Sequence, residues 1–255
     1  YMSQILVELI KLANLIITLT KSIASGNRIQ DMLEFGEEPD NTGKQDCKVA
    51  ATAGAEIRFD HVSCRYPQAS ADALEDISFT AKAGETIGII GGTGSGKTTI
   101  FNLLLRMYRV GKGQILIDKL DIYDYSKDVF NSNISIVNQK TFIFNMSIRA
   151  NLSLIDSNKK RQIDACKRVG IHDFIMSLPD GYSTILKDDA TNMSGGQKQL
   201  LSLARALLTS SEIILLDEVT SSLDPRTTDK IIKLLDDLKT DHTIIIITHN
   251  KDLMR

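Results

Sequence analysis

The sequence predicts an α/β fold with a mostly parallel sheet. Segments 212–218 (EIILLDE) and 242–250 (HTIIIITHN) are continuous apolar strands, the kind that a parallel sheet buries on both faces. A third apolar strand, 86–91 (TIGIIG), leads into a glycine-rich loop and then a helical pattern. Strands that alternate with helices in this way favour right-handed crossovers between parallel neighbours.

Composition limits the class of protein. The chain has 255 residues, 42% hydrophobic and 24% charged, with a formal net charge of −2, which suits one or two globular domains with a real core. The near-neutral balance argues against a nucleic-acid binder, and the basic residues at 159–161 and 167–168 are interpreted as a solvated helix face. Three widely spaced cysteines, Cys47, Cys64 and Cys166, indicate free thiols in a reducing compartment.

The N-terminal segment, residues 1–25, predicts a long helix that is apolar around most of its circumference. On the membrane-insertion scale Glu8 and Lys11 cost more than the surrounding Leu, Ile and Val residues gain, so a lone membrane span is disfavoured. A helix whose polar stripe faces other helices or a water-filled cavity is one alternative, and a soluble coiled-coil or docking helix is the other. The segment lacks the features of a signal peptide, and Tyr1 at the first position suggests a fragment.

Further elements follow this helix. Residues 36–55 lose all hydrophobic periodicity and carry Gly, Pro and charge, which is typical of a linker. The other predicted elements are strands at 56–66, 73–85 and 113–118, a helix at 98–110, and a mostly helical region from about 146 to 208 that breaks at 178–182.

Residues 91–98 (GGTGSGKT) match the phosphate-loop pattern G-x-x-x-x-G-K-[ST] in the right context, after a strand and before a helix. Gly91, Gly94 and Gly96 let the backbone curl so that successive N–H groups face phosphate oxygens, and the following helix adds its positive end. Lys97 is predicted to reach the β- and γ-phosphates, and Thr98 to offer its hydroxyl to Mg²⁺.

An apolar strand that ends in an acid is the expected second half of such a site, and Asp217 ends the apolar run IILLD. Glu218 follows directly, where a carboxylate can polarise a water for in-line attack on the γ-phosphate. The alternative for Glu218 is a carboxylate at a helix N-terminus, favoured by the helix dipole.

The stretch 192–199 (NMSGGQKQ) places two adjacent glycines at the entrance of a strongly helical pattern, with Ser194 where an N-cap belongs. Each glycine destabilises a helix by about 1 kcal/mol relative to alanine. The pattern therefore indicates a need for bare backbone N–H groups at a helix start, which form an anion site.

These motifs in this order, followed by an apolar strand that ends at His249, resemble the nucleotide-binding domain of an ABC transporter over residues 56–255. The resemblance implies a P-loop NTPase (RecA-like) core with a mostly parallel sheet, an antiparallel β subdomain and a helical signature subdomain at about 146–208. Residues 142–152 are similar to the segment through which exporters' nucleotide domains meet their membrane domains. Residues 1–35 resemble the cytoplasmic end of a last transmembrane helix and its extension, as in exporter-type half-transporters with the membrane domain fused N-terminally.

The resemblance also implies a site shared between two subunits. In one subunit, the implied nucleotide contacts are Tyr66, which stacks on adenine, and Gly92, Thr93, Gly94, Ser95, Gly96, Lys97, Thr98 and Thr99. From the opposite subunit, the implied contacts are Ser194, Gly195, Gly196, Gln197 and Asp224. The implied Mg²⁺ ligands are Thr98, Gln139 and Asp217, and the implied catalytic residues are Glu218, His249, Gln139 and Lys97.

The function that the resemblance implies is an ATP-hydrolysing motor with ATP and Mg²⁺ as cofactors. Its implied partners are a second nucleotide-binding domain, as a homodimer or a heterodimer, and the transmembrane domains of the same transporter, with no nucleic acid. The domain would lie at the cytoplasmic face of the cell membrane. ATP would close the dimer and hydrolysis would release it, which drives substrate export.

The chain departs from the family pattern at several places. Met193 replaces the usual leucine of the signature, and Val219 replaces a small residue or proline after the catalytic glutamate. Asp188 stands where a glutamate usually precedes the signature and contacts the membrane domain, and its side chain is shorter by one methylene. The sequence stops six residues after His249, whereas the family normally continues, so we expect a C-terminal truncation that weakens folding or dimerisation.

Two other classes are alternatives. A soluble ABC ATPase that acts on DNA or ribosomes is disfavoured by the acidic balance and the apolar leading helix, and its DNA-structural type needs a long coiled coil between Gln139 and the signature, for which there is no room. An ATP-binding regulatory domain usually loses the catalytic glutamate or alters the signature, and this chain keeps both.

Overall fold

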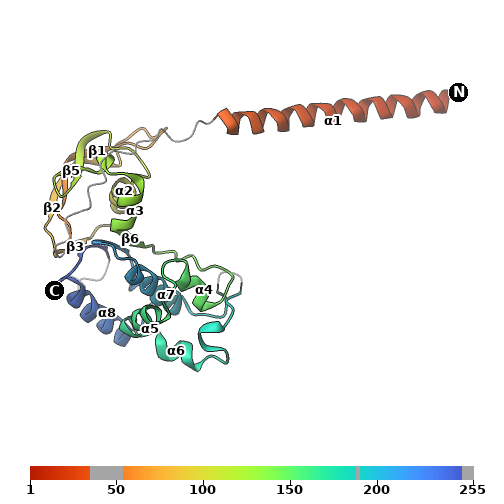
Figure 1. The fold of residues 1–255 in the computed structure, drawn as a ribbon. Coiled ribbons are helices and arrows are strands. Elements are labelled where there is room, and N and C mark those ends of the chain that lie inside the picture. Colours follow the sequence, from red (N-terminus) through yellow and green to blue (C-terminus); the bar gives the residue numbers. More distant parts are fainter. Residues whose placement is uncertain (35–53, 188–189, 249–255) are drawn as a thin grey trace. The chain divides into compact units, whose positions relative to one another are not determined.

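The computed structural model describes residues 1–34, 54–187 and 190–248 (Figure 1). The chain divides into two compact units, Tyr1–Asn41 and Thr42–Arg255, and each is described by itself. The features predicted from sequence that lie outside the described residues are most of the linker, Cys47, Asp188 and His249.

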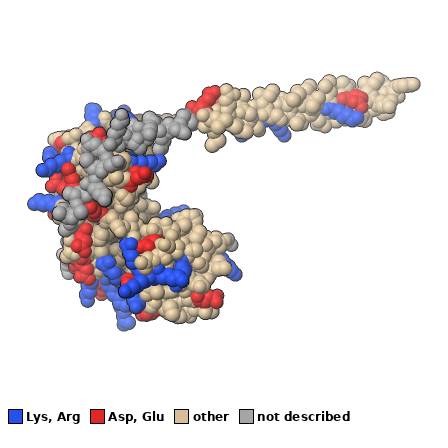
Figure 2. Space-filling view, viewed as in Figure 1, with Lys and Arg blue, Asp and Glu red and all other residues tan. Residues whose placement is uncertain are grey.

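The described residues of the first unit form the helix α1 (Met2–Glu34), which includes the long apolar helix predicted within residues 1–25. By length and composition it is apolar enough to cross a membrane, and the face shown in Figure 2 is mostly uncharged. The two charges that disfavour a lone span form an ion pair, with Lys11 Nζ 2.8 Å from Glu8 Oε1. The two opposite charges therefore lie together on one side of α1.

The centre of the second unit is a parallel sheet with the strand order β3-β8-β7-β6. Its strands are β3 (Thr86–Ile89), β6 (Ile134–Val137), β7 (Ile213–Asp217) and β8 (Thr243–Ile247). Side chains of β7 and β8 alternate between two hydrophobic clusters, with Ile214, Leu216, Ile244 and Ile246 in one and Ile213, Leu215, Ile245 and Ile247 in the other. Burial on both faces explains the unbroken apolar runs and confirms the predicted parallel α/β core.

A second sheet is antiparallel, with the order β2-β1-β4-β5. Its strands are β1 (Ile57–Cys64), β2 (Leu74–Ala81), β4 (Lys112–Ile117) and β5 (Leu120–Asp121). The register between β1 and β4 shifts beside Gly113, whose φ is +78°. A Cβ on Gly113 would clash with the His61 carbonyl oxygen, so only glycine fits at this irregularity. This sheet is the antiparallel β part that the resemblance implied.

The helix after the phosphate loop is shorter than predicted. α2 (Lys97–Leu104) ends well before residue 110, and Arg106 takes a left-handed conformation with φ 58°. The Arg106 guanidinium lies 3.6 Å from the centroid of the Phe130 ring and donates a hydrogen bond to the Tyr125 carbonyl oxygen at 3.3 Å. These tertiary contacts override the helical pattern of residues 105–110.

The remaining helices are α3 (Lys127–Asn133), α4 (Ile148–Ser153), α5 (Lys159–Val169), α6 (His172–Ser177), α7 (Gly195–Leu208) and α8 (Pro225–Leu238), with short 3₁₀ turns η1 (Ile122–Asp124) and η2 (Gly181–Ser183). α3 and α7 pack against β6, whereas α4 and α5 pack against α7 and α6 packs against α5. The predicted break at 178–182 is confirmed, the basic residues of α5 are exposed as expected, and Cys64 and Cys166 are free and buried. The periodicity of the sequence did not predict β6, α3 or α8.

The core assignment can be tested with a matched pair of leucines. Leu201 of α7 is fully buried, whereas Leu154 is 52% exposed. We expect Leu201→Ala to lower the free energy of unfolding by about 2–5 kcal/mol, because it leaves a cavity against the sheet. Leu154→Ala should change it by less than about 0.5 kcal/mol. Urea denaturation measures both values, and similar losses in the two variants would contradict this core.

Candidate active site

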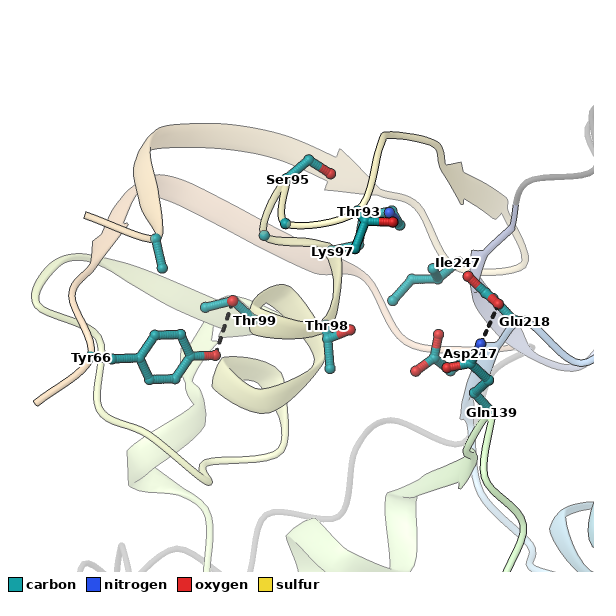
Figure 3. Close-up of a pocket in the computed structure, with 13 residues that line it drawn as sticks. Tyr66, Thr93, Ser95, Lys97, Thr98, Thr99, Gln139, Asp217, Glu218 and Ile247 are labelled. Carbon is teal, nitrogen blue, oxygen red and sulfur yellow. Dashed lines mark hydrogen bonds between the residues drawn. The ribbon is translucent and has the colours of Figure 1, made fainter. Parts of the chain in front are cut away.

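The carboxyl ends of the parallel strands converge on a cavity of about 420 Å³ (Figure 3). β3 leads into the phosphate loop, β7 ends at Asp217, and Gln139 follows β6. The residues that line the cavity are Tyr66, Ala73, Thr93, Gly94, Ser95, Gly96, Lys97, Thr98, Thr99, Gln139, Asp217, Glu218 and Ile247. The fold therefore brings the phosphate loop and the acids that follow a different strand into one site.

The phosphate loop takes a curled path. Gly94 and Gly96 have φ +81° and +86°, in the left-handed region that favours glycine. A Cβ on Gly96 would also meet the Ala73 carbonyl oxygen at 2.7 Å, so packing and backbone conformation both exclude a larger residue. Gly96 is the N-cap of α2 and brings no side-chain cap, so the first N–H groups of that helix remain for an anion.

Lys97 supplies positive charge in the cavity. Its Nζ donates to the carbonyl oxygens of Gly91 and Gly92, at 2.7 and 2.8 Å, which holds the ammonium within the loop. Curled backbone N–H groups and an ammonium are donors that bind phosphate oxygens strongly. The loop therefore fits the phosphates of a nucleotide.

Two adjacent carboxylates lie beside the loop. Burial and repulsion from Glu218 raise the pKa of Asp217, and Lys97 opposes that shift. Gln139 Nε2 donates to Glu218 Oε2 at 2.5 Å, so the amide and the carboxylate point toward each other (Figure 3). Glu218 has φ 50°, and α8 begins only at Pro225, so the alternative of a helix N-terminal carboxylate at Glu218 is wrong.

Oxygen donors for a metal also line this cavity. Thr98, Gln139 and Asp217 supply a hydroxyl, an amide oxygen and a carboxylate. Mg²⁺ usually binds through one or two carboxylates and keeps waters and substrate phosphates as its other ligands. Within residues 1–34, 54–187 and 190–248, no three His, Cys, Asp or Glu side chains form an all-protein metal cage. The donors present therefore fit Mg²⁺ held jointly with a phosphate ligand.

Tyr66 lies at the opposite end of the cavity from the acids (Figure 3). Its hydroxyl is 2.9 Å from Thr99 Oγ1, at the start of α2. The cavity therefore has an aromatic ring at one end, two carboxylates at the other, and the phosphate loop between them.

The signature residues lie outside this cavity. Ser194 caps α7, because its Oγ accepts from the Gln197 N–H at 3.2 Å while Gln197 Oε1 accepts from the Ser194 N–H at 2.8 Å. A Cβ on Gly196 would meet the Ser222 carbonyl oxygen at 2.8 Å, whereas a Cβ on Gly195 would approach Ser222 no closer than 3.5 Å. Packing within the chain thus requires glycine at 196. The same packing does not require glycine at 195.

The structure also gives local contacts for other residues that line or were expected to line a nucleotide site. Asp224 is the N-cap of α8 and accepts from the Thr227 Oγ1 at 2.6 Å and the Thr227 N–H at 3.1 Å, and these bonds lower the pKa of Asp224. Gly92 does not line the cavity, although its neighbours in the loop do. Ala73 and Ile247 line it without having been predicted, because neither belongs to a motif.

A glycine-rich loop between a parallel strand and a helix, with an acid at the end of a second strand of the same sheet, defines a P-loop nucleotide-binding domain. A sequence profile of the ABC transporter family matches residues 74–221. The chain belongs to the ABC transporter family.

Individual relatives agree with this assignment. The chain is 40% identical over 238 residues to an uncharacterized ABC transporter ATP-binding protein of Bacillus subtilis, a match that covers 92% of this chain and 40% of that protein. It is 36% identical over 234 residues to the ATP-dependent lipid A-core flippase of Acinetobacter baylyi, covering 91% and 40%. A solved structure of a bacterial Atm1-family ABC exporter with ATP bound matches with a TM-score of 0.81 at 29% identity, covering 93% and 42%. The chain spans about two fifths of the length of these relatives.

The raised pKa of Asp217 predicts a stability change. Because ionisation is less favourable in the folded chain than in the unfolded chain, the Asp217 carboxylate costs folding free energy at neutral pH. We expect Asp217→Asn to raise the free energy of unfolding at neutral pH in metal-free, nucleotide-free buffer. The gain should shrink as the pH falls through the raised pKa, where Asp217 is protonated and neutral like asparagine.

Denaturation at neutral and at acidic pH measures this effect, with Asp229→Asn on the exposed face of α8 as the matched control. A stability loss in Asp217→Asn, or a gain that does not depend on pH, would contradict the prediction.

Proposed function

We propose that this chain is the ATP-binding and ATP-hydrolysing motor domain of an ABC exporter, which pairs with a second such domain around two ATP molecules. The observation that carries the proposal is the convergence of the phosphate loop, Asp217, Glu218 and Gln139 on one cavity. Groups that bind phosphate, groups that bind metal and a proton acceptor meet there, as phosphoryl transfer to water requires.

Each side chain of the cavity has a task in this proposal. Lys97 and the N–H groups of the loop bind and orient the phosphates. Thr98, Gln139 and Asp217 hold Mg²⁺, which when bound neutralises charge on the phosphate oxygens. The Glu218 carboxylate accepts a proton from the attacking water, and the Gln139 amide that now donates to Glu218 Oε2 orients that water.

Pairing of two domains accounts for the separate position of the signature. Ser194 and Gly195 are exposed at the start of α7, where a phosphate held by a partner can approach bare N–H groups. In the proposed dimer Gln197 and Asp224 contact the same interface, and His249 hydrogen-bonds the γ-phosphate.

Membrane export is supported by three observations. α1 is long and apolar enough to span a membrane, and the relatives include a flippase and an exporter. The segment similar to the membrane-domain contact of exporters carries the exposed Phe142 and Phe144, which line a groove of about 440 Å³ together with Arg205. In the proposal α1 is the cytoplasmic end of a last transmembrane helix, and the second unit lies at the cytoplasmic face of the cell membrane.

A substitution at the proton acceptor tests the proposal. We expect Glu218→Gln to lower the ATPase rate by at least about 100-fold, because it removes the base and keeps the shape of the side chain. Mg-ATP should then convert this variant from a monomer to a dimer, measured as solution mass by light scattering of the full chain. Glu212→Gln is the matched control, since Glu212 lies at the opposite end of β7 and should leave the rate unchanged.

The outcomes separate the alternatives. ATP binding without dimer formation would contradict self-pairing and favour a heterodimer with a different subunit. A wild-type chain that binds ATP and never hydrolyses it, even with its partner present, would favour the ATP-binding regulatory class. Failure to bind ATP would contradict the proposal as a whole.

A further inference from the structure

Tyr66 is held by three groups of its own chain. Its hydroxyl lies 2.9 Å from Thr99 Oγ1, and Asn102 Nδ2 donates to the same hydroxyl at 3.4 Å. Its ring packs against the Tyr108 ring with the two planes at 90° and the centroids 4.7 Å apart. Such an aromatic pair is favourable beyond the area that it buries. The hydrogen bonds anchor the tip of the Tyr66 side chain, and the aromatic contact restricts the plane of its ring.

Tyr108 makes this contact from outside the cavity. Tyr66 lines the cavity and Tyr108 does not, and Tyr108 is 39% exposed. Tyr108 belongs to the turn in which Arg106 takes its left-handed conformation. The turn that follows the early end of α2 therefore places the Tyr108 ring against the Tyr66 ring.

We infer that Tyr108, Thr99 and Asn102 are positioning residues that order the Tyr66 ring in advance for the base of a nucleotide. The inference rests on the proposed function, which assigns the cavity to ATP and the ring to its base. Ordering a side chain during binding costs free energy, and a ring that is already ordered avoids that cost. Since the Tyr66 hydroxyl is engaged with Thr99 and Asn102, Tyr66 recognises the base by stacking on its π-face rather than by a hydrogen bond.

The two hydrogen bonds also attach the base site to the phosphate site. Thr99 and Asn102 belong to α2, the helix whose first turn follows the phosphate loop (Figure 3). The anchor of Tyr66 therefore lies on the helix that directly follows the phosphate loop. Tyr108 lies beyond the end of that helix, so its removal releases the plane of the Tyr66 ring and leaves in place both the hydrogen bonds at the ring's tip and the phosphate loop. Removal of Tyr108 should therefore weaken the binding of the base and leave the binding of the phosphates unchanged.

The test compares a ligand that has a base with one that has none. Calorimetry on the full chain measures the binding of ADP and of pyrophosphate, each with Mg²⁺, so that hydrolysis does not interfere. We expect ADP to bind Tyr108→Ala about three- to tenfold more weakly than wild type, the size of one aromatic pair or one newly ordered side chain. Pyrophosphate should bind both chains equally.

Two further variants separate positioning from damage to the turn. Tyr108→Phe keeps the ring and should bind ADP as wild type does. Met107→Ala changes the exposed neighbour of Tyr108 and should likewise leave ADP binding unchanged.

A double-mutant cycle supplies the decisive comparison. In a chain that already carries Tyr66→Ala, adding Tyr108→Ala should cost no further ADP affinity, because the ring that Tyr108 positions is absent. Equal losses for ADP and pyrophosphate, or a loss that persists without Tyr66, would overturn the inference while leaving the proposed function intact. A wild-type chain that binds neither ligand would overturn the proposed function itself.

Discussion

The pairing of β7 with its two neighbours is the constraint on which the rest of the second unit depends. Asp217 pairs with Ile247 of β8, and Leu216 pairs with Val137 of β6, so the three strands end at nearly the same level. Side chains on the two faces of the sheet enter separate hydrophobic clusters, and a slip of one residue would send each of them to the wrong side. Core packing therefore sets the register of the strands, and this register places Asp217 and Gln139 at the level of the phosphate loop.

The carboxyl end of these strands also carries several features that destabilise the folded chain. Glu218 has a left-handed backbone although it is not glycine, and burial and repulsion from Glu218 raise the pKa of the neighbouring Asp217. Gly94 and Gly96 contribute no side chains that could pack and stabilise the loop. The buried strands on either side hold these groups together, so the stability of the sheet supports a site that would not form by itself.

The parts of the fold that follow local rules could be predicted from sequence. Strands buried on both faces are recognisable as apolar runs, and the phosphate loop is a contiguous motif whose neighbours confirm it. The strand β6 was missed because four residues that include Ser135 give too short a pattern. The early end of α2 depends on the contact of Arg106 with Phe130, which only the folded chain brings together.

The candidate site likewise has some features that the local sequence predicts and others that only tertiary contacts create. The residues of the loop and the two acids were predictable from their motifs, whereas the support of Tyr66 by Tyr108 arises from a turn that the helical pattern concealed. The requirement for glycine at 196 was likewise invisible, because the carbonyl of Ser222 that excludes a side chain is delivered by the fold. The N-capping role of Asp224 was readable in principle, since Pro225 and Thr227 follow it at helix-start spacing.

The close approach of Gly196 to Ser222 has a mechanical consequence. Gln199 of the same helix donates to the Glu218 carbonyl oxygen at 3.5 Å and to Ser221 Oγ at 3.3 Å, so α7 is hydrogen-bonded directly to the segment that begins at Glu218, the proposed proton acceptor. In the proposed dimer, each chain would serve its own ATP through Glu218 and its partner's ATP through the start of α7. The contact between α7 and the segment after Glu218 would then connect two ATP molecules. A displacement caused by hydrolysis or release of one ATP would reach the other through a few backbone atoms. The dimer would contain two such contacts, one in each chain, and together they would synchronise the two ATP sites.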